Sequence, residues 1–157
     1  MSLILLNGGA TYKGEWVGDK IDGYGIYTWP NGSRYKGAFK NGLEHGYGKY
    51  FFNFGDTYEG DFKDGTWSGR GIYRSSEGNV YEGGWVDNKE HGVGWIKYAN
   101  GNSYFGEWRD GKQHGFGIFL WGGGDLYVGI WRDDYKEGEG IYFYPDGARF
   151  KGQFKKS

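Results

Sequence analysis

The sequence predicts an all-β protein, an elongated, curved, single-layer antiparallel β-meander made of tandem β-hairpins. An aromatic residue, any residue, glycine, any residue and then tryptophan or phenylalanine follow one another seven times in the 157 residues. Each copy begins 23 residues after the previous one, and the first six are each followed by a Gly-X-Gly pair. No segment shows the three-to-four-residue apolar spacing of a helix, so we expect almost no helix.

The repeat is numbered here from position 0, the aromatic residue that begins each copy. Position 0 is occupied by Tyr12, Tyr35, Tyr58, Tyr81, Tyr104, Tyr127 and Phe150. Glycines recur at positions 2, 11, 13 and 20 of all six full repeats. Such strict spacing predicts one repeat array over 1–157, with an incomplete repeat at 1–11, full repeats starting at 12, 35, 58, 81, 104 and 127, and an incomplete repeat at 150–157.

Each element follows from local pattern. Leu3 to Leu6 is expected to be the second strand of the first incomplete repeat. In the first full repeat, residues 12–16 alternate aromatic and glycine residues with charged residues. In residues 25–29, Gly25, Tyr27 and Trp29 share one face in the same way. This period of two is typical of strands. Residues 17–22 and 30–33 are rich in glycine, asparagine and aspartate and read as turns. Every full repeat is therefore one hairpin, and Phe150 begins a last single strand.

The sixth repeat departs most from the pattern. Asp134 stands where other repeats carry a turn glycine, and Glu137 stands at position 10, where three repeats carry histidine. We expect its hairpin turn to bend differently. Both chain ends fall within a repeat, so the expectation is either an excerpt of a longer array or an array whose ends associate.

A pairing register is expected in which position 0 faces position 17, so that Tyr12 pairs with Trp29 and Gly14 lies opposite Tyr27. The large rings would then cover the strand glycines from neighbouring strands. The predicted row across the sheet is Tyr12, Trp29, Tyr35, Phe52, Tyr58, Ser75, Tyr81, Tyr98, Tyr104, Trp121, Tyr127, Tyr144 and Phe150.

Composition excludes several classes of function. The 19 basic and 20 acidic residues leave a net charge of −1 and are scattered, which argues against nucleic-acid binding. There is no cysteine, hence no disulfide and no thiolate metal site. The longest aliphatic run, Leu3 to Leu6, is too short for a membrane span, and no leader sequence surrounds it. We expect a soluble, cytoplasmic protein.

Catalysis is not expected. His45, His91 and His114 all occupy position 10, so they read as turn stabilisers rather than metal ligands or general bases. The six Gly-X-Gly pairs lack the third glycine and the helix of a dinucleotide-binding loop. The sequence therefore predicts a non-enzyme with no catalytic, cofactor-binding or metal-binding residues.

Two surfaces are candidates for binding. The first is a groove above the aromatic rings, where a peptide or a helix of a partner would lie. Its predicted residues are Tyr12, Trp29, Tyr35, Phe52, Tyr58, Tyr81, Tyr98, Tyr104, Trp121, Tyr127 and Tyr144. The second is on the opposite face, which turns apolar only in the C-terminal half and would form an interface patch or fold upon itself. Its predicted residues are Trp95, Phe105, Phe116, Ile118, Leu120, Val128, Ile130, Ile141 and Phe143.

The repeat resembles the MORN repeat, whose core reads Tyr-X-Gly-X-Trp, a short polar turn and His-Gly-X-Gly. Residues 81–85 with 91–94, and 104–108 with 114–117, match it throughout. The resemblance implies a scaffold or adaptor at membranes or cytoskeletal structures, or an accessory module beside a catalytic domain. Some members of that family are linked to anionic phospholipids.

The hypothesis is accordingly a non-enzymatic scaffold that binds a protein segment in the aromatic groove and self-associates through its C-terminal half or its open ends. Two alternatives stay open. A peripheral membrane adaptor would bind anionic phospholipid weakly through Lys13, Lys36, Lys40, Lys63 and the tail Lys155-Lys156. An accessory module of a larger enzyme is the other.

Overall fold

The computed structural model describes residues 1–157 and confirms the all-β prediction. It contains fourteen β-strands, one short 3-10 turn and no α-helix. No helix is therefore long and apolar enough to cross a membrane. The chain forms two compact units, Met1–Ser76 and Glu77–Ser157, each described by itself below.

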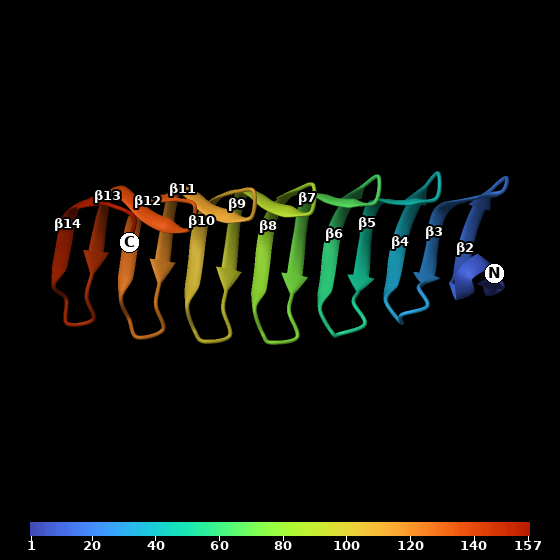
Figure 1. The fold of residues 1–157 in the computed structure, drawn as a ribbon, viewed down its shortest axis with the longest axis horizontal. Coiled ribbons are helices and arrows are strands. Elements are labelled where there is room, and N and C mark those ends of the chain that lie inside the picture. Colours follow the sequence, from blue (N-terminus) through green and yellow to red (C-terminus); the bar gives the residue numbers. More distant parts are fainter. The chain divides into compact units, whose positions relative to one another are not determined.

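The first unit is an antiparallel meander in which consecutive strands are neighbours (Figure 1, blue to green). Its elements are β1 (Ile4–Leu5), the 3-10 turn η1 (Asn7–Gly9), β2 (Thr11–Val17), β3 (Lys20–Thr28), β4 (Arg34–Lys40), β5 (Leu43–Phe51), β6 (Thr57–Lys63) and β7 (Thr66–Arg74).

The second unit repeats this arrangement (Figure 1, green to red). Its strands are β8 (Val80–Val86), β9 (Lys89–Lys97), β10 (Ser103–Arg109), β11 (Lys112–Leu120), β12 (Leu126–Arg132), β13 (Tyr135–Phe143) and β14 (Arg149–Phe154). Each full repeat is one hairpin, as predicted. Leu3 to Leu6 supplies only the two-residue strand β1, in which Ile4 pairs with Tyr12.

The hairpin turns use two residues, at positions 6 and 7. Asn41 and Gly42 both have positive φ, at 52° and 84°, which is the signature of a type I′ turn. Asp133 and Asp134 of the sixth repeat take φ of 48° and 72°. The expectation of a different bend in that repeat is therefore wrong, because aspartate tolerates the left-handed conformation well enough to form the same turn.

The predicted register is wrong by two residues. Position 0 pairs with position 15, so that Tyr12 lies opposite Tyr27, and Gly14 lies opposite Gly25. A shift of two keeps every side chain on its predicted face, because side chains alternate with a period of two. The two faces of the sheet were thus assigned correctly, although the cross-strand partners were not.

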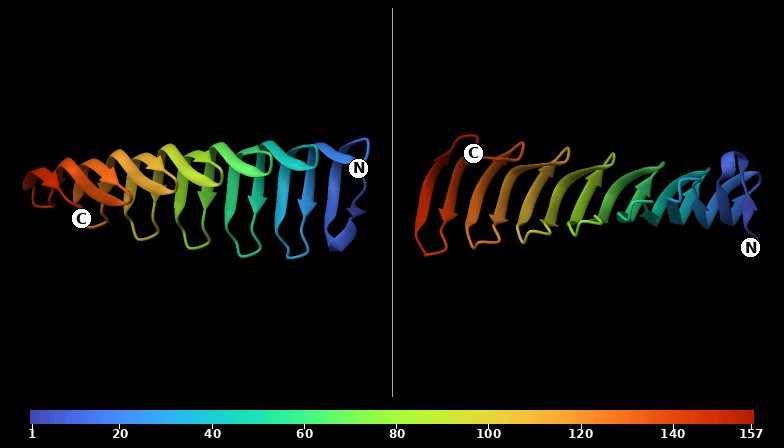
Figure 2. Two further views of the ribbon diagram at one scale, coloured as in Figure 1. Left: turned by 45° about the horizontal axis from the view of Figure 1, so that its top comes forward. Right: turned by 60° about the horizontal axis from the view of Figure 1, so that its bottom comes forward.

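A bulge at the hairpin tip causes the shift. The tight turn fixes the pair Trp16–Ile21, but pairing resumes only at Gly14–Gly25, so three residues of β3 lie opposite Glu15. The middle one, Gly23, has φ of 93°, which only glycine adopts freely. The same irregularity recurs in the other full hairpins that follow. Bulges bend a strand, and the strands curl over toward their hairpin turns (Figure 2).

The core is a ladder of rings on the inner side of this bend. The tyrosines at position 0 are buried, as are Phe39, Phe62, Trp85, Trp108 and Trp131 at position 4. Position-0 rings meet position-4 rings of their own and the following repeat edge to face, with centroids 4.9–5.5 Å apart and planes at 78–89°. This is the preferred geometry of aromatic pairs.

Each core tyrosine also covers a pair of glycines. A Cβ atom added at Gly14 or Gly25 would lie 2.3 Å from the Tyr12 hydroxyl oxygen. The prediction that rings cover the strand glycines is confirmed in kind, but the covering ring belongs to the same repeat and strand as the first glycine. The glycines at positions 2 and 13 are therefore needed for space.

Candidate protein-binding surface

The six position-0 tyrosines of the predicted groove are not open to a partner. Tyr12, Tyr35, Tyr58, Tyr104 and Tyr127 are fully buried, and Tyr81 is 2% exposed. Every one of these hydroxyls donates a hydrogen bond of 2.8–3.0 Å to the backbone carbonyl three residues on. The prediction was wrong for this part of the groove, because these rings pack between position-4 rings and belong to the core.

The other five groove residues, all at position 17, remain accessible. Trp29, Phe52, Tyr98 and Trp121 are half-buried, and Tyr144 is exposed. They directly follow the second strand of each hairpin, on the ring-bearing face. Together with the rings at position 15 they form what we call the outer aromatic row.

In the first unit the outer aromatic row comprises Tyr27, Trp29, Tyr50, Phe52 and Tyr73. Neighbouring rings are in contact, with centroids 4.7 Å apart for Tyr27–Trp29, 5.1 Å for Trp29–Tyr50 and 4.7 Å for Tyr50–Phe52. Phe54, which is 62% exposed, extends the row at 5.0 Å from Phe52. The rings thus present a continuous apolar strip that runs across the strands.

In the second unit the row comprises Tyr98, Phe119, Trp121, Tyr142 and Tyr144. The centroid distances are 6.4, 4.4, 5.5 and 4.8 Å along the row. The Tyr142 hydroxyl donates to Asp125 Oδ1 at 2.9 Å. Burial and this hydrogen bond to a carboxylate raise the pKa of Tyr142 to about 12. The hydroxyl is therefore held in place and neutral.

Sequence reasoning missed the side chains at position 9, which border the row. The curled hairpin tip brings position 9 of one repeat against position 17 of the preceding repeat. The ring centroids of Trp67 and Phe52 lie 5.9 Å apart, and the Lys136 Nζ lies 5.3 Å from the Trp121 ring centroid. Position 9 holds Ile21, Glu44, Trp67, Glu90, Gln113 and Lys136. Because this position differs in nearly every repeat, the repeat pattern gave no signal for it.

Two carboxylates and one amine at position 9 titrate abnormally. Burial raises the pKa of Glu44 and of Glu90, and for Glu90 the nearby Asp134 carboxylate adds to the effect. Burial lowers the pKa of Lys136. None of the three takes part in an ion pair. The row is thus bordered by charges without a counter-ion.

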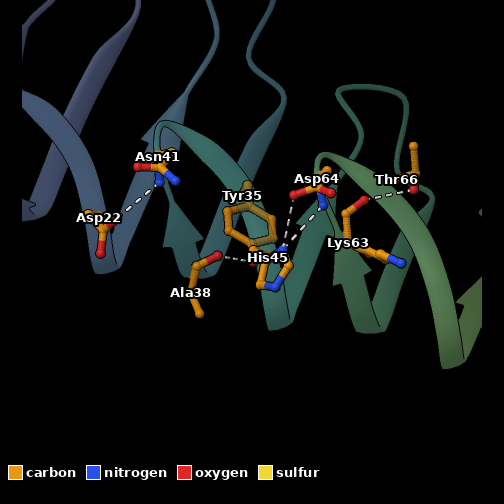
Figure 3. Close-up of polar contacts among 8 residues, drawn as sticks. All are labelled: Asp22, Tyr35, Ala38, Asn41, His45, Lys63, Asp64 and Thr66. Carbon is orange, nitrogen blue, oxygen red and sulfur yellow. Dashed lines mark hydrogen bonds and ion pairs between the residues drawn. The ribbon is translucent and has the colours of Figure 1, made fainter.

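The histidines lie at the joints between hairpins. His45 Nδ1 accepts the backbone N–H of Asp64, in the next hairpin turn, at 3.3 Å, and Asp22 Oδ2 accepts that of Asn41 at 3.0 Å (Figure 3). The expected turn-stabilising role is confirmed for His45, which joins one turn to the next. No group of three or more histidine, cysteine or acidic side chains is arranged to hold a metal ion.

The predicted patch lies on the opposite face of the second unit. Rows of apolar side chains cross its strands, as in Trp95–Phe105–Ile118–Val128–Ile141. Phe105 is 54% exposed and Phe116 51% exposed. Phe116, Val128, Ile130 and Ile141 line a hollow of about 380 Å³. The remaining members, Leu120 and Phe143, lie at the ends of β11 and β13. The role of this patch as an interface stays a prediction.

The same face of the first unit is more polar, with charged side chains between the exposed Tyr24 and Tyr47. Lys49 and Glu59 form an ion pair of 3.4 Å, and the Tyr47 hydroxyl donates to Glu59 Oε1 at 2.8 Å. The contrast between the units that the sequence predicted is therefore present in the structure.

Two of the solved structures that match this chain are domains of SAS-4 and of CPAP. The TCP domain of Drosophila melanogaster SAS-4 (dCPAP), in complex with a proline-rich motif of Ana2 (dSTIL), is 13% identical, and the match covers 98% of this chain and 90% of that chain with a TM-score of 0.57. The TCP10 domain of Danio rerio CPAP is 12% identical over 97% and 83% of the two chains, with a TM-score of 0.31. At 13% identity the likeness to the SAS-4 domain concerns the fold alone.

Comparison with curated proteins gives no match. The model of the MORN repeat matches six consecutive segments, 12–34, 35–57, 58–80, 81–103, 104–126 and 127–149, with the boundaries that the sequence predicted. These segments cover most of the chain and coincide with its six hairpins. The chain therefore belongs to the MORN-repeat family.

Proposed function

We propose that this protein is a non-enzymatic scaffold that binds an extended, proline-rich protein segment along its outer aromatic rows. The observation that carries the proposal is the strip of touching, partly exposed rings in each unit. Aromatic strips of this kind are how proteins bind proline-rich segments, whose polyproline II helix is already ordered before binding.

The spacing of the repeat supports an extended occupant. Strands lie about 4.8 Å apart, so successive hairpins repeat every ~9.6 Å across the sheet. A polyproline II helix advances ~9.3 Å per turn of three residues. A segment lying across the strands would therefore present every third residue to an equivalent pair of rings. An α-helix, with a pitch of ~5.4 Å, has no such match.

The comparison with the SAS-4 domain supports the same occupant, because that domain has a similar fold and was solved with a proline-rich motif. The absence of catalysis is part of the proposal. His45 lies at a hairpin joint, and the buried tyrosine hydroxyls of the core donate to backbone carbonyls. Neither arrangement presents a nucleophile with a base beside it.

The test is fluorescence anisotropy with a labelled decaproline peptide and a Gly-Ser peptide of equal length. The intact chain should bind decaproline and not the Gly-Ser peptide. Combining Trp29→Ala and Phe52→Ala with Trp121→Ala and Tyr144→Ala should weaken binding at least tenfold, since aromatic anchors dominate such contacts. Phe116→Ala, on the opposite face, is the matched control and should bind normally.

Circular dichroism would establish that each variant is folded. Equal binding by the four-ring variant and the intact chain would contradict the proposal, as would a lack of any decaproline binding. Flotation with vesicles of anionic phospholipid, in the absence of decaproline binding, would favour the membrane-adaptor alternative instead.

A further inference from the structure

The position-9 side chains of the second unit form a series with a carboxylate at one end and an ammonium group at the other. Glu90 lies in β9, Gln113 in β11 and Lys136 in β13, and each stands at the same place in its hairpin. All three face the side of the sheet that bears the outer aromatic row. A segment bound along that row would pass a carboxylate first and an ammonium group last.

Glu90 lacks a cationic partner. Within its hairpin it pairs with Trp85, and no lysine, arginine or histidine forms an ion pair with it. Asp134 is the charged group that acts on it, and Asp134 already accepts the backbone N–H of Gln113 at 2.8 Å. A partly buried carboxylate without a cationic partner favours the arrival of a basic side chain.

Lys136 lacks an anionic partner. Its Nζ stands 5.3 Å from the ring centroids of Trp121 and Tyr142 and 5.8 Å from that of Tyr127. The rings stabilise the cation by cation–π attraction but offer it no hydrogen-bond acceptor. An ammonium group donates three hydrogen bonds, so a carboxylate of a bound segment would complete its environment.

Gln113, which lies between them in the series, is too buried to contact a bound segment. It is 5% exposed, and its side chain hydrogen-bonds to Tyr98. The electrostatic selection therefore rests on the two ends alone. They are separated by four strand spacings, about 19 Å. Six residues of polyproline II span ~18.6 Å, which is the same length.

We infer that the second unit selects proline-rich segments carrying a basic and an acidic residue six positions apart, with the basic residue at Glu90 and the acidic residue at Lys136. The inference rests on the proposed function and adds sequence selection and orientation to it. The order of the two charges along the segment fixes the direction in which it lies. The first unit cannot make this selection, because its position-9 residues are Ile21, Glu44 and Trp67.

The test uses the full chain with Trp29→Ala and Phe52→Ala, so that the row of the first unit does not contribute. Four labelled proline-rich peptides are compared by anisotropy at low salt. Two have lysine and glutamate six residues apart in either order, one has glutamine at both places, and one has the charges three residues apart. One of the two peptides whose charges are six residues apart should bind between about threefold and tenfold more tightly than the glutamine peptide, as two partly exposed ion pairs allow.

Charge reversal provides the specific control. Glu90→Lys combined with Lys136→Glu should transfer the preference to the peptide with the opposite order of charges. Glu139→Gln combined with Lys151→Gln alters two charges on the opposite face and should change nothing. The preference should also disappear at high salt.

The outcomes separate the two proposals. If all four peptides bind equally and charge reversal has no effect, the inference is wrong while the aromatic row still binds proline. If the peptide with charges three residues apart binds as tightly as the best one, the spacing argument is wrong. If no proline-rich peptide binds the intact chain, the proposed function fails and the inference fails with it.

Discussion

At the scale of single residues, the fold depends on what fits beneath one tyrosine. Tyr104 lies across Gly106 and Gly117, its hydroxyl bonds to the Glu107 carbonyl at 2.9 Å, and Trp108 and Trp131 pack on its faces and edges. The ring needs both glycines because a methyl group on either would occupy its place. The repeated glycines are thus a packing requirement rather than a source of flexibility.

Gly117→Ala should therefore destabilise the protein strongly. The added Cβ would lie 2.3 Å from the Tyr104 hydroxyl oxygen and 2.4 Å from its Cε2, so the ring would have to leave the core. We expect a loss of at least about 2 kcal/mol in the free energy of unfolding, at the upper end of the cost of overpacking. Urea denaturation followed by tryptophan fluorescence would measure it.

Gly123→Ala is the matched control. Its added Cβ would have Asp125 Oδ2 at 3.8 Å as its nearest atom, and its φ is not positive. Its unfolding midpoint should stay near that of the original chain. A Gly117→Ala midpoint equal to that of the control would show that the tyrosine ring can move aside without cost.

The residue scale also shows what sequence reasoning could not reach. The face of each side chain was predicted, because parity alone decides it. Burial of Tyr12 or Tyr58 was not, because an aromatic at a strand position can be a core residue or a binding residue. The repeat pattern also gives no sign that Asp61 and Glu107 each accept a backbone N–H across their hairpin bulge, from Arg70 and Phe116 respectively.

At the scale of elements, each hairpin is joined to the next through its turn. The backbone N–H of Gly65 donates to the Glu44 carbonyl at 2.8 Å, and that of Asp64 donates to His45 Nδ1 at 3.3 Å. In the preceding joint, Asp22 supplies the acceptor for Asn41 at 3.0 Å. In these two joints position 10 therefore supplies an acceptor, which is an imidazole nitrogen in one and a carboxylate oxygen in the other.

This equivalence predicts the outcome of two substitutions. His45→Ala removes the acceptor and should lower the free energy of unfolding by about 0.5–1.5 kcal/mol, the usual net value of one hydrogen bond. His45→Asn should retain most of the stability, because its side-chain oxygen can accept the same N–H without placing a second carboxylate beside Asp64, whose Oδ1 lies 3.4 Å from His45 Nδ1. Chemical denaturation at neutral pH of both variants beside the original chain would decide it, and equal losses for the two would refute the role of position 10 as an acceptor.

The register shows where prediction at this scale stopped. The strands and their faces follow from the alternation, although the turn expected over 17–22 is confined to Gly18 and Asp19, because β2 extends to Val17 and β3 begins at Lys20. The pairing does not follow from it, because a bulge opposes three residues to one and moves the partner of Tyr12 from Trp29 to Tyr27. The contact of position 9 with the outer aromatic row was not predicted for a related reason, since it forms only because that bulge bends the hairpin tip.

At the scale of the whole molecule, the constant period has a testable consequence. All six repeats have 23 residues, and every hairpin consists of a seven-residue and a nine-residue strand. Each hairpin contacts mainly the strands on either side of it, which is the property that makes repeat proteins tolerate changes in repeat number. Deletion of a complete repeat should then leave the remaining hairpins able to pair in the same register.

Removal of residues 104–126 joins Ser103 to Tyr127 and places one position-0 tyrosine where another stood. We expect the shortened chain to unfold cooperatively, with a smaller dependence of its unfolding free energy on urea because less surface is buried. Its Trp85 would meet Tyr81 as before, and Trp131 would take the place of Trp108 beside that ring. Circular dichroism and urea denaturation would measure both properties.

Removal of only 103–111, which contains β10 and the turn that follows, is the informative comparison. It takes out one strand, so β11 could keep both its native direction and its native face only by running parallel to β9, without the long crossover that parallel strands need. This chain, although longer, should lose the cooperative transition or its β signal. Retention of a sharp transition by this chain, or its loss in the chain that lacks 104–126, would mean that the hairpin is not the unit from which the protein is built.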